Sequence, residues 1–154
     1  MPNLPTINDF LSRKRIAVVG VSRNPKHFSR SVYGDLLKRG YDPIPVNPHP
    51  TKIEGRPAHS RIQEINPPPE AALITVSADR LEAALHDCGE AGVKRVWWLR
   101  SPRDAKARLA AVRLCQDLGM SFVDGLCPYL FLDNTGFPHN FHRWLMKQFG
   151  GWPK

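Results

Sequence analysis

Residues 15–48 read RIAVVGVSRNPKHFSRSVYGDLLKRGYDPIPVNP and predict a strand, a turn, a helix and a second strand. The apolar run Ile16–Val19 is typical of a parallel strand that helices cover on both faces. Gly20 ends this run, because a residue without Cβ lets the backbone turn sharply. The helix that follows has one apolar side and ends at Gly40. We therefore expect a nucleotide-binding βαβ unit whose helix amides point back at the turn.

The turn after the first strand gathers groups that suit a phosphate. Cations near a helix N-terminus oppose the helix dipole, so a bound anion would relieve an unfavourable arrangement. The alternative is a turn-capping serine beside a solvated cluster of cations. We predict that the ligand contacts lie at Gly20, Val21, Ser22, Arg23, Asn24, Lys26 and Arg30.

The same region lacks the fingerprint of dinucleotide enzymes. The pattern G-x-G-x-x-G would need glycines at Ser22 and Pro25. NAD-binding chains also carry an acidic residue after the second strand, where this chain has Val46, Asn47, Pro48 and His49. A free ribose diol gains no carboxylate acceptor here, and a ribose that carries a phosphate suits the site better.

These motifs resemble those of the small single-domain CoA-binding proteins, which are similar to the N-terminal CoA-binding domain of the succinyl-CoA synthetase α-subunit. The resemblance covers most of the chain and is carried by Gly20–Lys26, Gly40-Tyr41, Val46–Pro48, Ile53, Gly55, Lys94–Trp97 and Cys127-Pro128. The chain departs from the family pattern at Ser29, Arg100, Ser101 and Tyr129.

The resemblance implies a module that holds coenzyme A or an acyl-CoA through backbone amides and cations. Its synthetase relatives place their phosphorylated histidine in a separate domain. No catalytic set and no metal cluster can be assembled from this sequence, so an enzyme is the less favoured interpretation. We expect Lys52 to reach the 3′-phosphate of CoA. Two alternatives stay open: an NADP-binding oxidoreductase or redox sensor, and a basic interaction subunit.

The rest of the chain continues the alternation of strands and helices. Further strands are expected at 71–76, 93–99 and 120–123, and further helices after Ser77 and Ser101. A helix within residues 1–14, starting near Asn8 or Asp9, and another over 139–150 complete the prediction. The expected fold is α/β: a Rossmann-like, doubly wound parallel sheet of about five strands in the order 3-2-1-4-5, with helices on both faces.

That strand order predicts the position of the ligand crevice. It lies beyond the carboxyl ends of the strands, where the winding reverses. The turn Gly20–Lys26 should then face Arg100 across the crevice. The ends of strands two and three should lie on the adenosine side, with contacts at Asn47, Pro48, Val76 and Ser77.

Composition limits the remaining possibilities. A chain of 154 residues suits one domain, and a net charge of +8 calls for an acidic partner such as CoA. The basic residues are scattered along helices, which disfavours nucleic acid. No long apolar segment or export signal is present, and three cysteines form no C-x-x-C pair, so we expect a cytoplasmic protein without membrane contact. Cys127 is either a reactive thiol or a buried side chain. The sequence does not indicate the oligomeric state.

Overall fold

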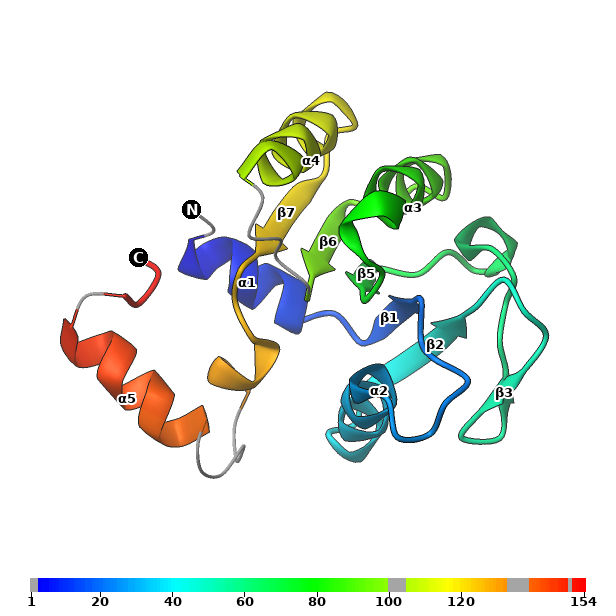
Figure 1. The fold of residues 1–154 in the computed structure, drawn as a ribbon, viewed down its shortest axis with the longest axis horizontal. Coiled ribbons are helices and arrows are strands. Elements are labelled where there is room, and N and C mark those ends of the chain that lie inside the picture. Colours follow the sequence, from blue (N-terminus) through cyan, green and yellow to red (C-terminus); the bar gives the residue numbers. More distant parts are fainter. Residues whose placement is uncertain (1–2, 100–104, 133–138, 150) are drawn as a thin grey trace.

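A five-stranded parallel sheet forms the centre of the computed structural model, which describes residues 3–99, 105–132, 139–149 and 151–154 (Figure 1). The spatial order of the strands is β2-β1-β5-β6-β7. Their bounds are Arg15–Val19 for β1, Asp42–Val46 for β2, Ala71–Ile74 for β5, Arg95–Trp98 for β6 and Ser121–Asp124 for β7. The α/β, Rossmann-like class predicted from the sequence is confirmed.

The predicted strand order needs a correction. Counted along the chain, the sheet strands lie in the order 2-1-3-4-5, because β5 pairs with β1 and β2 lies at the edge. Pro43 and Pro45 explain the edge position of β2. The amide of Asp42 donates to the carbonyl of Lys14, which lies just before β1. Because successive amides of a strand point in opposite directions, positions 43 and 45 point away from β1. Prolines there have no N–H to offer a second neighbour.

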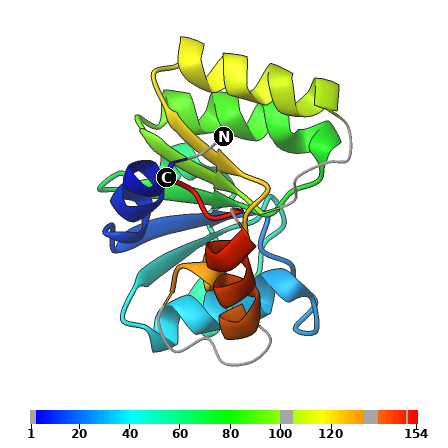
Figure 2. The same ribbon diagram turned by 90° about the vertical axis from the view of Figure 1, so that its left-hand side faces the viewer.

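Helices cover both faces of the sheet (Figures 1 and 2). One face carries α3, Ala78–Glu90, and α4, Ala105–Asp117, which lie side by side. The other carries α1, Leu4–Leu11, and α2, Phe28–Lys38. Each face has its own apolar cluster, and the adjacent indoles Trp97 and Trp98 are buried in opposite clusters. Successive residues of a strand point to opposite faces, so one indole lies on each side of the sheet.

The N-terminal helix begins earlier than predicted. Asn3, and neither Asn8 nor Asp9, is its N-cap: the Asn3 side chain accepts a hydrogen bond from the Thr6 amide at 2.9 Å. Pro5 lies in the first turn, where a missing N–H costs nothing. The Leu4 amide donates to the Lys154 carbonyl at 2.9 Å, so the two ends of the chain adjoin.

The remaining helices meet the predictions in part. The C-terminal helix α5 spans His139–Phe149, and residue 150 lies outside the described residues. The predicted helix start at 101–104 also lies outside them. A 3-10 helix, η2, spans Pro128–Leu130 after β7. Among the described residues, no helix combines the length and the apolar character needed to cross a membrane.

The connection from β2 to β5 holds two small elements. A hairpin pairs β3, Lys52–Ile53, with β4, Arg56–Pro57, through a turn in which Glu54 and Gly55 have φ of 48° and 78°. The 3-10 helix η1, Ile62–Glu64, follows, and Ile62 and Ile65 are buried against the α3 side. Residues three apart lie on one side of a helical turn, which explains why both isoleucines face the core.

Candidate functional site

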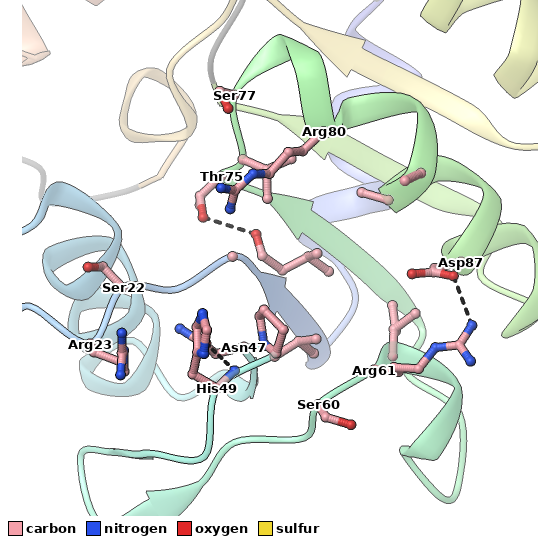
Figure 3. Close-up of a pocket in the computed structure, with 18 of the residues that line it drawn as sticks. Ser22, Arg23, Asn47, His49, Ser60, Arg61, Thr75, Ser77, Arg80 and Asp87 are labelled. Atoms are coloured by element: carbon pink, nitrogen blue, oxygen red, sulfur yellow. Dashed lines mark hydrogen bonds and ion pairs between the residues drawn. The ribbon is translucent and has the colours of Figure 1, made fainter.

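An open cleft lies at the carboxyl edge of the sheet, where β1 and β5 end side by side (Figure 3). Its volume is about 1050 Å³, at the upper end of the range of small-molecule sites. Five segments line it: the turn after β1, the end of β2, the η1 segment, the turn after β5 and one side of α3. In a doubly wound sheet this is the expected ligand position, because the connections after β1 and β5 leave in opposite directions.

Gly20 allows the turn after β1 to lie directly against the turn after β5. Its φ is 88°, and a Cβ at this position would lie 2.5 Å from Cγ1 of Val76. Only glycine therefore fits, because any side chain meets both the strained backbone and the next turn. The Gly20 amide donates to the Val46 carbonyl at 3.0 Å, which ties the turn to the end of β2 as well.

Thr75 fastens the cleft floor and was missed by the sequence reasoning. It is 3% exposed, and its hydroxyl donates to the Val19 carbonyl at 3.0 Å. The indole of Trp98 donates to the Val76 carbonyl at 3.0 Å. These two bonds hold the β5–α3 turn in place. The available signal was a lone polar residue at the end of the apolar run Ala71–Ile74.

Asn47 joins two of the lining loops. Its side-chain amide donates to the Val21 carbonyl at 2.8 Å, and its Oδ1 accepts from the His49 amide at 2.8 Å. Asn47 is 8% exposed, so its polar atoms are occupied inside the cleft wall. The loop that it supports presents Pro48 and His49 to the cleft, and both are exposed.

The turn after β1 satisfies many of its own amides. Ser22 donates its amide to the buried Ser29 hydroxyl at 2.9 Å, and Asn24 donates to the Ser22 hydroxyl at 3.1 Å. His27 caps α2, since its Nδ1 accepts from the Ser29 amide at 3.2 Å. The helix amide of Ser29 is therefore not available to a ligand. The predicted contact between helix amides and a phosphate therefore does not involve the Ser29 amide.

The predicted site residues divide into three groups. The cleft lining brings together Gly20, Ser22, Arg23, Asn24, Asn47, Pro48, Val76 and Ser77. Outside that lining are Val21, Lys26, Arg30 and Lys52. Arg100 lies outside the described residues, so its place opposite the turn after β1 stays a prediction. Among the described residues, Thr75 and Val76 of the adjoining strand end lie beside Gly20.

The predicted residues outside the lining have other contacts. Val21 is fully buried in the core. Arg30 pairs with Glu54 of the hairpin at 3.0 Å and donates to the Arg23 carbonyl at 3.4 Å. Lys26 and Lys52 are exposed. Arg30 therefore fastens the hairpin to the turn, which is a structural role.

Two arginines for which the sequence predicts no role in binding, Arg61 and Arg80, line the cleft. Arg61 enters from the η1 segment and pairs with Asp87 at 3.3 Å and with Glu90 at 3.8 Å. Arg80 is exposed on α3 and extends toward the end of β5 (Figure 3). Together with Arg23, they place positive charge at both ends of the cleft. Helical periodicity around Ser77 was the signal that could have assigned Arg80 to this side.

The carboxyl group next to Arg80 stays ionised. A hydrogen bond from the Ser77 hydroxyl holds the pKa of Asp79 below its usual range. The Asp79 carboxylate stabilises the positive N-terminus of α3. Its negative charge also opposes the binding of an anion at this end of the cleft, and the positive charge of Arg80 offsets that repulsion.

Cys127 lies away from the cleft lining, after β7. It is half-buried, and burial raises the pKa of its thiol. Cys88 of α3 and Cys115 of α4 are buried in the apolar cluster on that face of the sheet, and burial raises the pKa of each to about 12. A raised pKa means that the reactive thiolate is scarce at neutral pH.

The sequence matches one protein-family model and two known proteins. A family model described as CoA binding domain matches residues 14–133. The α-subunit of acetate–CoA ligase [ADP-forming] II from Pyrococcus furiosus is 33% identical over 88 residues, which are 56% of this chain and 19% of that protein. An uncharacterized protein of Bacillus subtilis, YneT, is 28% identical over 127 residues, covering 82% of this chain and 91% of that one.

Solved structures agree with the fold. A hypothetical protein from Pyrococcus horikoshii aligns with a TM-score of 0.70 at 24% identity, covering 83% of this chain and 87% of that one. A dinucleotide-forming acetyl-coenzyme A synthetase of Candidatus Korarchaeum cryptofilum aligns with a TM-score of 0.66 at 26% identity, over 71% of this chain and 25% of that one. Because the family model spans most of the chain, the protein belongs to the CoA-binding domain family.

Proposed function

We propose that the protein binds coenzyme A or a CoA thioester in the cleft at the ends of β1 and β5, and that it catalyses no reaction alone. The family match supports CoA as the ligand. The observation that supports the location is the cleft itself, which lies where the sheet reverses its winding and where the turns after β1 and β5 meet at Gly20 and Val76.

The pyrophosphate belongs at the turn after β1 in this proposal. Arg23 is exposed beside the cleft, and His49 faces it from the end of β2. Charge-assisted hydrogen bonds to phosphate are about twice as strong as neutral ones. The bonds within the turn hold it in one shape before the ligand arrives, so little conformational entropy is lost on binding.

The adenosine belongs at the other end, between η1 and α3. Ile62 and Ala84 provide apolar surface there, and Arg61 and Arg80 provide cations for the 3′-phosphate. Lys52, which the sequence predicts for this phosphate, lies on the hairpin outside the lining. Arg80 is better placed, since Arg61 is already paired with acidic residues of α3.

Calorimetric titration with CoA, acetyl-CoA, dephospho-CoA, NADP and NAD at two salt concentrations tests the proposal. We expect CoA and acetyl-CoA to bind most tightly, and dephospho-CoA about tenfold more weakly because it lacks one charge-assisted contact. NAD should bind most weakly. Tighter binding of NADP or NAD than of CoA at both salt concentrations would contradict the proposal and favour the oxidoreductase alternative.

A variant pair tests the location. Arg80→Ala should reduce the affinity for CoA about tenfold and leave the affinity for dephospho-CoA nearly unchanged. Lys94→Ala is the matched control, because Lys94 is exposed before β6, at the opposite edge of the sheet. Equal losses for CoA and dephospho-CoA would show that Arg80 does not contact the 3′-phosphate.

A further inference from the structure

Most amides of the turn after β1 already have acceptors within the protein. Side chains and one carbonyl of the same segment accept the amides of Ser22, Asn24, Lys26 and His27, at 2.9–3.1 Å. Pro25 has no N–H. Because these donors are occupied, a phosphate bound at this turn has to take most of its hydrogen bonds from side chains.

His27 is a side chain of this segment for which the sequence predicts no role, and it lines the cleft. The ring is half-buried at the start of α2. Its Nδ1 accepts from the Ser29 amide at 3.2 Å and lies 2.8 Å from the Ser29 hydroxyl oxygen. The other ring nitrogen, Nε2, forms no hydrogen bond or ion pair with any residue that the structure describes.

The contact with the Ser29 amide determines which nitrogen of the neutral ring carries the proton. A backbone N–H can only donate, so Nδ1 is the acceptor and carries no proton. The proton of the neutral ring is therefore on Nε2, which makes Nε2 a donor. The two ring nitrogens point in different directions, so this N–H is turned away from Ser29 and from the start of α2.

The ring of His27 is held in place before any ligand binds. Ser29 is fully buried, and its hydroxyl oxygen also accepts from the Ser22 amide at 2.9 Å, which ties the ring to the turn. On its other side the ring packs against Phe28, with ring centroids 4.6 Å apart. Ser29 is a position at which the chain departs from the family pattern, so the family match does not imply this arrangement.

We propose that His27 is a further ligand contact of the cleft, whose Nε2–H donates to a phosphate oxygen of bound CoA. The inference rests on the proposed function. It adds a neutral, directional donor to the exposed positive charge of Arg23. Salt screens the attraction of an exposed charge strongly and affects a hydrogen bond from a half-buried neutral ring less. His27 thus supplies phosphate affinity that persists at high salt.

Calorimetric titration of His27→Ser with CoA separates this contact from the helix cap. Serine keeps an oxygen that can cap the helix but lacks the ring donor. We expect His27→Ser to unfold in urea as the wild type does, and to bind CoA about tenfold more weakly at both low and high salt. His86→Ser is the matched control and should keep the wild-type affinity, because His86 is exposed on α3 outside the cleft lining.

His27→Ala distinguishes a ligand contact from a purely structural role, because alanine removes the cap and the ring together. We expect both variants to lose CoA affinity equally and only His27→Ala to lose stability. If His27 acts as a cap alone, His27→Ala will bind CoA weakly while His27→Ser binds it like the wild type. That result would overturn the inference.

Nitrogen NMR of the histidine-labelled wild-type chain at pH 8 gives a readout that does not depend on affinity. We expect His27 to show the Nε2–H tautomer, and its Nε2 signal to shift when CoA is added while the signals of His86 stay in place. The Nδ1–H tautomer, or an Nε2 signal unchanged at saturating CoA, would overturn the inference. A wild-type chain that binds no CoA would instead refute the proposed function, and this contact with it.

Discussion

The turns after β1 and β7 leave the same edge of the sheet but differ in character. The turn after β1 keeps its cation Arg23 exposed beside an open cleft. The turn after β7 is closed by contacts: Arg108 pairs with buried Asp124 at 2.5 Å, and the Tyr129 hydroxyl donates to Asp35 at 2.5 Å. The Trp97 indole also donates to the Leu126 carbonyl at 3.0 Å.

The difference follows from topology. Connections on both sides of the β1–β5 pair leave toward opposite faces, so a gap opens between them. β7 lies at the edge of the sheet with only β6 beside it, and its turn folds back over the α2 side. The end of a strand therefore forms an open cleft in one case and a structural clasp in the other.

We expect the largest effect from adding a side chain where Gly20 lies against Val76. Gly20→Val should destabilise the protein by roughly 3 kcal/mol or more, because the added atoms meet Val76 and the backbone is in the left-handed region. Urea denaturation measures the loss. Gly92→Val is the matched control, since Gly92 has φ of 77° but open space around its Cβ position. Equal losses for both variants would show that strain alone, without the contact to Val76, explains the effect.

Breaking the clasp after β7 should destabilise the protein without affecting the ligand. Arg108→Met leaves the buried Asp124 carboxylate without its partner, at a cost of about 2–3 kcal/mol, less than for a fully buried pair because Arg108 is 38% exposed. Thermal denaturation measures this, and titration of the folded variant should give the wild-type CoA affinity. A large loss of affinity would mean that the two turns are coupled.

Removing cations from the turn after β1 should have the reverse effect. Arg23→Ala should weaken CoA binding about tenfold with little change in stability. The sequence predicts Lys26 as a ligand contact. Because Lys26 lies outside the cleft lining, we expect Lys26→Ala to weaken CoA binding less than Arg23→Ala does. Titration at low salt compares them. A larger effect at Lys26 would extend the site beyond the described lining.

The smallest effect is expected at Cys127. Cys127→Ala should change CoA affinity by less than about threefold, because the thiol lies away from the cleft lining. Burial raises the pKa of this thiol, so the thiolate is scarcer at pH 8 than in an unfolded chain. Alkylation followed by mass spectrometry should therefore be slower in the native protein and speed up as pH rises. Fast alkylation at neutral pH that bound CoA prevents would make the thiol part of the site.

Much of the fold was determined by the sequence alone. The apolar run Ile16–Val19 ended by Gly20 specifies a buried strand and its turn, since periodicity and a missing Cβ act over a few residues. Ile62 and Ile65 likewise marked a packed helical turn. The motifs that carry the CoA-binding resemblance can also be recognised from the sequence, because each of them is a short continuous segment.

Tertiary structure decided the order of the strands and the use of each cation. Pro43 and Pro45 do mark β2 as an edge strand, but which strand lies beside β1 depends on pairing between segments far apart in the chain. Arg30 pairs with Glu54 of the hairpin, whereas Arg80, for which the sequence predicts no role, lies in the cleft lining. A long charged side chain can reach in many directions, and only the packed neighbours select one.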